Sequence, residues 1–334
     1  MIEDRKLEHI KICLEKDVKA SHNYWDDVVI KHVTIPKVDL EDVDIRTEFL
    51  GIKLEAPLII DAMTGGHRVA KSINENIAKA AEELGIGMAV GSQRSAIENP
   101  ALEYTYSVVK KYNVPLRMGN LGAPQFAMGY GEEEVIRAIE MIDAHAMEIH
   151  FNYLQEAVQP EGDRKVNGLV ENLERFAKKY KLIGKETGAG FDIDSAKTLK
   201  NIGFAAIDVS GVSGTSFAAV EYHRGGSIGK TFWNWGLPSP YSLLSLRSIG
   251  LPMIGSGGIR NGLDVAKALC MGASVAGMAR EILRYATKSY EDVVKKIEEV
   301  IHELRVALFL AGVSSLKEIA DCKYIIRGEL RFWL

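Results

Sequence analysis

Several features that would assign this sequence to a class directly are missing from it. No apolar run reaches the roughly 18–20 residues of a membrane span, so we expect no membrane partner. The first stretch, MIEDRKLEHIKICLEKDV, is charged and has no apolar signal core, and we therefore expect a cytoplasmic protein. The net charge of −4 gives no basic surplus that would favour nucleic acid as a partner.

Cysteine is also scarce, which limits the chemistry that the chain can carry. The three cysteines, Cys13, Cys270 and Cys322, are far apart in the sequence and show no metal-ligand spacing. An odd, scattered set of this kind predicts reduced and mostly structural thiols. No Cys–His or Ser–His–Asp pairing is visible, which argues against covalent nucleophilic catalysis.

What the chain does contain is a repeated pattern that starts at residue 57. A short apolar run ends in small or polar residues, and an amphipathic segment follows. The eight runs are PLIIDAMTGG, IGMAVGSQR, PLRMGNLGAPQ, AMEIHFNYLQE, KLIGKETG, AAIDVSGVSG, PMIGSGG and SVAGMAR. Helical spacing is clear in RVAKSINENIAKAAEELG, GLDVAKALCMG and DVVKKIEEVIHELRVALFLAG.

Eight strand–helix units favour an α/β fold of the (β/α)8 or TIM-barrel type, with a doubly wound sheet as its structural rival. We predict the barrel for residues 57–312, with an N-terminal extension at 1–56 and a C-terminal tail at 313–334. The extension would cover one end of the barrel or reach its mouth. Residues 212–240, after the sixth strand, have few helical cues and predict a long loop that forms a lid, is disordered or packs in an oligomer interface.

The clearest chemical signal is GSGGIRNGLDVAKAL at the end of the seventh run. Gly257 and Gly258 let backbone N–H groups approach a phosphate, and a helix that begins near Gly262 would add a favourable dipole. The loops after the seventh and eighth strands of such barrels are a frequent phosphate site. We therefore predict phosphate binding here, although glycines that only form tight turns would give the same pattern.

Other strand ends carry candidate ligands, each with a simpler alternative. The backbone of MTGG could lie along a flat ligand or form a turn, and the Asn120 amide could bond the edge of a heterocycle or shape a turn. Arg94 could clamp an anion or be solvated at the surface. Lys185, if it points inward, would stabilise negative charge in the mouth, and otherwise it would pair with a nearby carboxylate.

The stretch HFNYLQE closes the fourth run with polar side chains that a core strand does not need. His150 and Asn152 share one face, because side chains alternate along a strand. Glu156 could ligate a hard cation such as Mg2+ or be a solvated loop residue. Near the N-terminus lie Arg5, Lys6 and His9. They could form a clamp for an anionic substrate, or they could be a solvated helical face.

Together these motifs resemble the type 2, flavin-dependent isopentenyl-diphosphate isomerases. The matching stretches occur in order from residue 5 to about residue 280: RKLEHI, AMTGG, GSQR, GNLGAPQ, HFNYLQEAVQPEGDR, KETGAG, SGVSGTS and GSGGIRNGLDVAKALCMGA. The resemblance implies interconversion of isopentenyl diphosphate and dimethylallyl diphosphate with reduced FMN and Mg2+. The reaction would be redox-neutral, with NAD(P)H serving only to reduce the flavin, and the assembly would be a homotetramer or larger.

The resemblance also implies roles for individual residues. FMN would be bound by Ala62, Met63, Thr64, Gly65, Ser92, Asn120, Lys185, Ser210, Thr215, Gly257, Gly258, Arg260, Ala276 and Gly277. The substrate would be bound by Arg5, Lys6, His9, Ser92, Gln93, Arg94, His150, Asn152 and Gln155. Glu156 would bind Mg2+ that bridges to the diphosphate. The catalytic residues would be Gln155, near the alkene, and Lys185, which would stabilise the anionic reduced flavin.

Three alternatives make different demands on the sequence. An α-hydroxy-acid oxidase or dehydrogenase needs a catalytic His followed by Gly-Gly-Arg, whereas the nearest stretch here is YHRGG. A barrel like that of IMP dehydrogenase needs a loop cysteine after the sixth strand, and SGVSGTS has none. A flavin-storage protein would not need Arg5, Lys6, Gln155 and Glu156.

Overall fold

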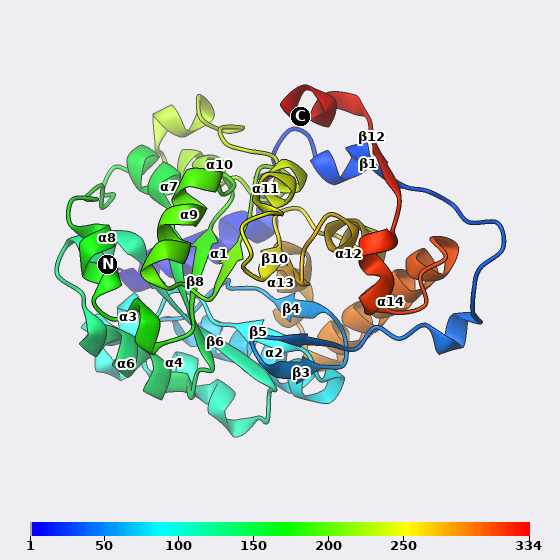
Figure 1. The fold of residues 1–334 in the computed structure, drawn as a ribbon. Coiled ribbons are helices and arrows are strands. Elements are labelled where there is room, and N and C mark those ends of the chain that lie inside the picture. The colour runs from blue at the N-terminus through cyan, green and yellow to red at the C-terminus, as the bar shows by residue number, and fades with distance from the viewer. Residues whose placement is uncertain (1) are drawn as a thin grey trace.

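The eight apolar runs are eight parallel strands that close into a barrel (Figure 1). The computed structural model describes residues 2–334, and for residues 2–4 the backbone alone. Around the barrel the strands follow the order β10-β11-β4-β5-β6-β7-β8-β9. Their bounds are β4 Leu58–Ile60, β5 Gly87–Ala89, β6 Leu116–Gly122, β7 Ala146–Phe151, β8 Leu182–Glu186, β9 Ala206–Asp208, β10 Met253–Gly255 and β11 Val275–Met278. The predicted (β/α)8 barrel is confirmed.

Amphipathic helices follow the strands and cover the barrel. The first, α2 Arg68–Leu84, begins at His67, whose ring accepts a hydrogen bond from the Val69 N–H, and ends at Gly85 with φ 63°. The other long helices are α6 Glu132–Ile142, α9 Ile193–Ile202, α11 Ser239–Leu246, α12 Gly262–Cys270 and α14 Tyr290–Leu310. Shorter ones are α3 Arg94–Glu98, α4 Tyr104–Ser107, α5 Ala123–Ala127, α7 Tyr153–Val158, α8 Leu169–Glu174 and α13 Arg280–Ala286. The three helices expected from their periodicity are α2, α12 and α14.

A hairpin of β2 Thr47–Phe49 and β3 Ile52–Leu54 closes the amino end of the barrel. Phe49 and Leu54 are buried in one cluster with the first residues of several strands, among them Leu116, Ala146 and Val275. Because that end is filled by apolar side chains, the opposite end, where the strands terminate, is the one that can hold a ligand.

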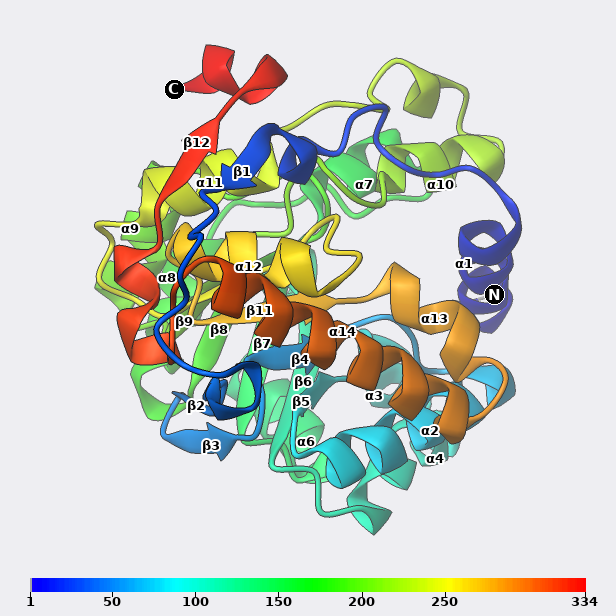
Figure 2. The same ribbon diagram turned by 90° about the vertical axis from the view of Figure 1, so that its right-hand side faces the viewer.

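The N-terminal helix lies on that opposite side. The helix α1 Ile2–Glu15 contacts α13 and α10 Phe217–His223 (Figure 2). The segment behind it is bound to the loop after β9, because the Ala20 N–H donates to the Gly214 oxygen and the Ser216 N–H donates to the Val18 oxygen, each at 2.8 Å. The N-terminal residues and the loop after β9 therefore form one wall of the mouth.

The C-terminal tail returns to the N-terminal segment. The strand β12 Tyr324–Ile326 pairs antiparallel with β1 Val28–Ile30. The expectation of reduced cysteines is wrong for two of the three: Cys270, at the end of α12, and Cys322 form a disulfide with their Cα atoms 5.5 Å apart. Only the fold of the tail brings the two residues together across a separation of 52 positions. Cys13 is free.

The long loop after the sixth strand has more structure than its sequence indicated. It contains α10 and a 3-10 turn, Ser227–Lys230. The helix begins at Ser216, whose side chain accepts a hydrogen bond from the Ala219 N–H. In the described part of the chain no helix is both long and apolar enough to span a membrane.

Candidate active site

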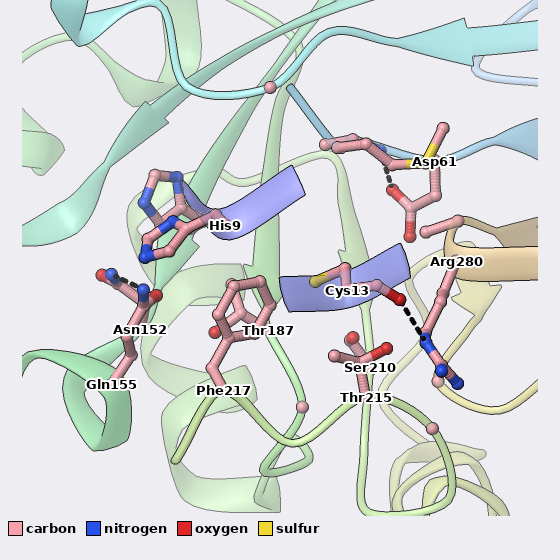
Figure 3. A pocket seen from close by; sticks show the side chains of 18 of the residues that line it. His9, Cys13, Asp61, Asn152, Gln155, Thr187, Ser210, Thr215, Phe217 and Arg280 are labelled. Carbon is pink, nitrogen blue, oxygen red and sulfur yellow. Dashed lines mark hydrogen bonds between the residues drawn. The ribbon is translucent and has the colours of Figure 1, made fainter. Parts of the chain in front are cut away.

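A cavity of about 340 Å³ lies at the carboxyl ends of the barrel strands, between them and α1, α10 and α13 (Figure 3). It brings together most of the residues predicted for the flavin site: Ala62, Met63, Thr64, Ser92, Asn120, Lys185, Ser210, Thr215, Gly257, Gly258, Arg260 and Gly277. The same cavity is lined by Arg5, Lys6, His9, Arg94, His150, Asn152, Gln155 and Glu156. The two predicted sets therefore face one shared space.

Three predicted residues are not part of the lining: Gly65, Gln93 and Ala276. The Gln93 side chain is fully buried and supports the barrel wall, since its Oε1 accepts from the Asn120 N–H at 2.9 Å and its Nε2 donates to the Ala138 oxygen at 2.8 Å. Gly65 is needed for close packing, because a Cβ there would overlap the ring of Tyr106.

Lys185 is buried, lines the cavity and is paired with carboxylates. Its Nζ donates to Asp61 Oδ2 at 2.8 Å and to Asp208 Oδ2 at 2.5 Å. Burial alone would lower its pKa, but the charges of Asp208, Asp61 and Glu148 raise the pKa above its ordinary value. The cluster therefore keeps a fixed cation at the cavity floor.

Glu148 is the third buried carboxyl of this cluster, and burial raises its pKa well above the usual range. Its Oε2 accepts from Asn120 Nδ2 at 2.7 Å, and Asn120 Oδ1 lies 2.7 Å from His150 Nδ1. Because Asn120 Oδ1 can only accept, His150 carries its proton on Nδ1 and presents Nε2 as its other polar atom. Burial, with the charges of Lys6 and Lys185, lowers the pKa of His150 to about 3, so the ring is neutral.

The residues after β7 form a second hydrogen-bonded group. Asn152 Nδ2 donates to Gln155 Oε1 at 3.2 Å and to Glu156 Oε1 at 2.9 Å. The first of these bonds is drawn in Figure 3. Gln155 Nε2 then donates to Glu221 Oε1 at 2.8 Å. Asn152, predicted as a substrate ligand, thus bonds the side chains of both Gln155 and Glu156.

Glu221 on α10 is a site residue that the sequence did not reveal. Its Oε1 also lies 3.1 Å from His9 Nε2, and its Oε2 accepts from Arg224 Nη1 at 2.5 Å. Burial opposes its ionisation, but the His9 and Gln155 hydrogen bonds and the charge of Arg224 outweigh burial and lower the pKa. An ionised Glu221 therefore ties α1 to Gln155.

The positive charges of the basic residues at the cavity rim are partly neutralised by nearby carboxylates. Arg94, expected to clamp an anion, donates to Glu98 Oε1 at 2.7 Å and to Asp163 Oδ2 at 2.5 Å while still lining the cavity. Burial, followed by the positive charges of Arg5 and Arg94, lowers the pKa of Lys6 to about 8. Lys6, Arg5 and Arg94 all line the cavity, and a bound anion would stabilise their positive charges.

The glycine loop after β10 has the conformation that a phosphate site requires. Gly257 and Gly258 have φ values of 81° and 86°, in the left-handed region that favours glycine. A side chain is also excluded by contact, since a Cβ on Gly257 would lie 2.7 Å from the backbone of Gly211.

The helix α12 begins at Gly262 as predicted, but its first N–H groups are bonded within the protein. The N–H of Gly262, at the start of α12, donates to Glu303 Oε2 at 2.7 Å, and the Asp264 N–H donates to Asn261 Oδ1 at 2.9 Å. The first turn of α13 lines the cavity instead. Arg260, a predicted FMN ligand, is held at 2.8 Å by Asp264 and also pairs with Asp26.

Glu156 is buried beside the cavity, and protein donors engage both of its oxygens. Oε1 accepts from Asn152, and Oε2 accepts from the Asp163 N–H at 2.7 Å. Burial raises its pKa above the ordinary value. Among the described residues, the carboxylates that cluster closely enough to hold a metal by themselves are Asp61, Glu148 and Asp208, and the Lys185 ammonium already lies among them.

The chain is similar to known proteins in sequence and in fold. The FMN-dependent dehydrogenase family model matches residues 244–325. The isopentenyl-diphosphate delta-isomerase of Thermoplasma acidophilum is 46% identical over 346 residues, covering 100% of this chain and 99% of that protein. The enzyme of that name from Methanocaldococcus jannaschii is 44% identical over 348 residues, covering 100% and 97%.

Solved structures with a similar fold are flavoproteins of low sequence identity. The recombinant flavin-binding domain of baker's yeast flavocytochrome b2 gives a TM-score of 0.65 at 15% identity, covering 95% of this chain and 85% of that one. A mandelate oxidase mutant with a monooxide FMN adduct gives 0.62 at 17% identity, covering 92% and 91%. These similarities establish the barrel fold, and the full-length relatives establish the family. The chain belongs to the type 2 isopentenyl-diphosphate delta-isomerase family.

Proposed function

We propose that this protein interconverts isopentenyl diphosphate and dimethylallyl diphosphate, using bound reduced FMN and Mg2+. The observation that carries the proposal is one cavity with two separate places for an anion. The glycine loop at Gly257 and Gly258 suits the phosphate of a cofactor, and the group around Arg5 and Lys6 suits the diphosphate of a substrate.

The residues of the cavity fit FMN. Thr64 Oγ1 is buried and, within the described residues, has no hydrogen-bond partner, so a polar ring edge would satisfy it. Asn120 retains one amide hydrogen beyond its bond to Glu148. Met63 and Thr64 would lie along the flavin, Ser92 and Asn120 would bond it, and Lys185 would stabilise its anionic reduced form. The FMN phosphate would be held by Thr215, Gly257, Gly258 and Gly277.

The site also fits Mg2+, in the manner that this ion prefers. Mg2+ commonly uses one or two carboxylates together with substrate phosphates and water. Glu156 supplies one carboxylate next to the basic subsite, and each of its oxygens has a lone pair beyond the hydrogen bond that it accepts. Because burial raises the Glu156 pKa, a bound cation would stabilise the ionised form.

When bound, reduced FMN supplies acid–base chemistry next to the alkene, and Mg2+ neutralises part of the diphosphate charge. The protein side chains bind the substrate and orient it. Gln155 is fixed by Asn152 and Glu221, so its remaining amide hydrogen has a set direction. A neutral amide is a poor acid, and Gln155 therefore positions the reacting alkene instead of protonating it.

The apolar part of the cavity suits the hydrocarbon part of such a substrate. Met63, Phe217 and Ile10 line it, and Ile10 is contributed by α1. With its amide turned so that both ends are satisfied, Gln159 accepts from Arg5 Nη1 at 3.1 Å and donates to Glu221 Oε1 at 3.2 Å. A closed α1 would keep water from the reacting carbon atoms.

The reaction moves a double bond and exchanges a proton without net oxidation, so NAD(P)H would serve only to reduce the flavin. We further propose a cytoplasmic homotetramer or larger assembly, as the family resemblance implies. The proposed division into an extension at 1–56, a barrel at 57–312 and a tail at 313–334 assigns the extension to substrate binding.

The test is isomerase activity of the purified protein with FMN, before and after anaerobic reduction. We expect a yellow complex that is inactive until it is reduced and then converts isopentenyl diphosphate without stoichiometric use of NAD(P)H. Oxidation of NAD(P)H in proportion to product would instead indicate a dehydrogenase. The position of His223 argues against that outcome, because this residue of YHRGG is exposed, contacts the Asp17 oxygen at 3.1 Å and is not part of the cavity lining.

A further inference from the structure

The 3-10 turn η1 Tyr24–Asp27 in the N-terminal extension lies directly behind the glycine loop. Trp25 is fully buried, and its Nε1 donates to the Gly257 oxygen at 2.9 Å. Asn23, the residue before the turn, donates from Nδ2 to the Gly258 oxygen at 2.9 Å. Ser239 Oγ donates to the Gly257 oxygen at 2.8 Å. Two successive carbonyls of the loop are thus held by side chains from outside the loop.

These hydrogen bonds also determine where the next N–H groups point. In a trans peptide the C=O and the following N–H point to opposite sides of the chain. Fixing the oxygens of Gly257 and Gly258 therefore turns the N–H groups of Gly258 and Ile259 away from Trp25 and Asn23. Both residues line the cavity, and among residues 2–334 neither N–H donates to a protein acceptor. Such donors are suited to an anion in the cavity.

Glycine makes this external support necessary. Both residues have positive φ values and no Cβ, so the isolated loop could rotate its peptide groups more freely than any other dipeptide. Without the side-chain bonds, ordering the loop around a phosphate would cost conformational free energy at the moment of binding. With them, the donors are oriented before the ligand arrives.

The supporting turn is itself fixed from two directions. Lys267 Nζ, on α12, donates to the Trp25 oxygen at 2.7 Å. The buried Asp27 accepts from the Leu330 N–H through Oδ2 at 3.0 Å, and its backbone oxygen accepts from the Arg327 N–H at 2.9 Å. The C-terminal tail therefore holds η1 against the loop.

We infer that Asn23 and Trp25 are positioning residues of the flavin site, which act by orienting the backbone donors that bind the FMN phosphate. The inference rests on the proposed flavin function and deepens it. Trp25 does not line the cavity and therefore acts through the loop, whereas Asn23 both bonds the loop and lines the cavity. The effect should concern the phosphate, because the carbonyls that they bond belong to the glycine pair and not to the residues expected along the flavin ring.

The experiment compares FMN with riboflavin, which has the same ring system and lacks the phosphate. Full-length protein freed of flavin is titrated with each ligand, and binding is followed by quenching of flavin fluorescence. Trp25→Phe keeps an aromatic ring and removes the N–H donor, and Asn23→Ala removes the second donor. Trp235→Phe is the matched control, since Trp235 is 63% exposed and does not line the cavity.

For Trp25→Phe we expect FMN affinity to fall roughly fivefold to tenfold, as for one lost hydrogen bond, with riboflavin affinity unchanged. Asn23→Ala should give the same selective loss, and Trp235→Phe should alter neither affinity. An equal loss for both ligands would show a merely structural role and overturn the inference. Unchanged dissociation constants for both ligands would also overturn it.

Two further outcomes keep the test decisive. If Trp25→Phe does not fold, as judged by circular dichroism, Ser239→Ala decides between the selective and the equal loss, because Ser239 also bonds the Gly257 oxygen and does not line the cavity. If the unaltered protein binds neither FMN nor riboflavin, the proposed function fails, and the inference fails with it. If the wild type prefers FMN and the variants keep this preference, the proposed function is supported and only the positioning role is contradicted.

Discussion

Glu156 lines the cavity as a buried carboxylate beside the basic subsite, and its proposed metal role can be tested at the scale of one residue. We expect Glu156→Gln to lower kcat/KM for isopentenyl diphosphate by about 100-fold and to abolish its dependence on Mg2+, because an amide provides no charge for the ion. The dissociation constant of FMN should not change. Steady-state kinetics across a Mg2+ titration give the answer.

The control for this substitution is Glu171→Gln on the exposed face of α8, which should behave as the unaltered protein does. Isomerisation by Glu156→Gln at the normal rate and with the normal Mg2+ response would remove Glu156 from the metal site.

Lys6 gives a pH dependence whose direction follows from its surroundings. Burial and the charges of Arg5 and Arg94 lower its pKa to about 8, so the free protein loses this positive charge as the pH rises through about 8. An anionic substrate binds the protonated form better. We therefore expect KM for the diphosphate substrate to rise above pH 8, with a smaller change in kcat.

Lys6→Arg provides the comparison for this prediction, because arginine stays protonated throughout this range. Its KM should stay nearly flat between pH 7 and about 9.5. The same alkaline rise in both proteins would mean that a group other than Lys6 titrates.

The residues that sequence reasoning found and missed differ in one physical respect. Strand-end motifs identified the residues that face the ligand, because all strand ends of a barrel meet at its mouth. Their partners were missed, although a signal existed: Asp61, Glu148 and Asp208 interrupt apolar runs. Charges in core strands require a counter-charge, and Lys185 provides it.

At the scale of elements, α1 is the part of the extension that reaches the substrate side of the cavity. It contributes Arg5, Lys6 and His9 to the lining, whereas the glycine loop is supported by residues 23–25. Removal of residues 1–10 should therefore raise KM for isopentenyl diphosphate by at least tenfold and change the dissociation constant of FMN by less than about threefold. Kinetics and flavin titration of the same preparation measure both.

The double substitution of Arg5 and Lys6 by alanine distinguishes the loss of positive charge from the loss of the helix that covers the cavity, because it leaves α1 in place. It should reproduce most of the effect on KM. Equal losses of substrate and FMN affinity in the truncated protein would contradict the assignment of α1 to the substrate.

Element prediction succeeded where apolar periodicity was strong and failed where tertiary packing decides. The eight strands and α2, α12 and α14 follow from their patterns. The helix α10 has only seven residues and is held by α7 and by the neighbouring 3-10 turn, so its sequence alone gave few cues. Missing this helix also concealed that Phe217 and Glu221, one turn apart, face the cavity side of α10 together.

At the scale of the whole molecule, the tail and the N-terminal extension hold each other against the barrel. The β1–β12 pairing, the Asp27 contacts and the Cys270–Cys322 disulfide all join segments that are distant in sequence. No local sequence pattern predicts contacts between such distant segments. The pairing of two of three scattered cysteines was therefore not predictable before the path of the tail was known.

The disulfide should contribute measurably to thermal stability, because it closes a loop between positions 52 residues apart. A disulfide typically stabilises a protein by about 2–4 kcal/mol, which corresponds to roughly 3–6 °C in Tm for a chain of this length. The variant with serine at positions 270 and 322 should lose that amount in a thermal melt monitored by circular dichroism. Dithiothreitol should lower the Tm of the unaltered protein towards that of the variant. Cys13→Ser, which leaves the disulfide intact, should melt as the unaltered protein does and respond to dithiothreitol equally. A serine variant with unchanged Tm would show that hydrogen bonds and β1–β12 pairing alone hold the tail in place.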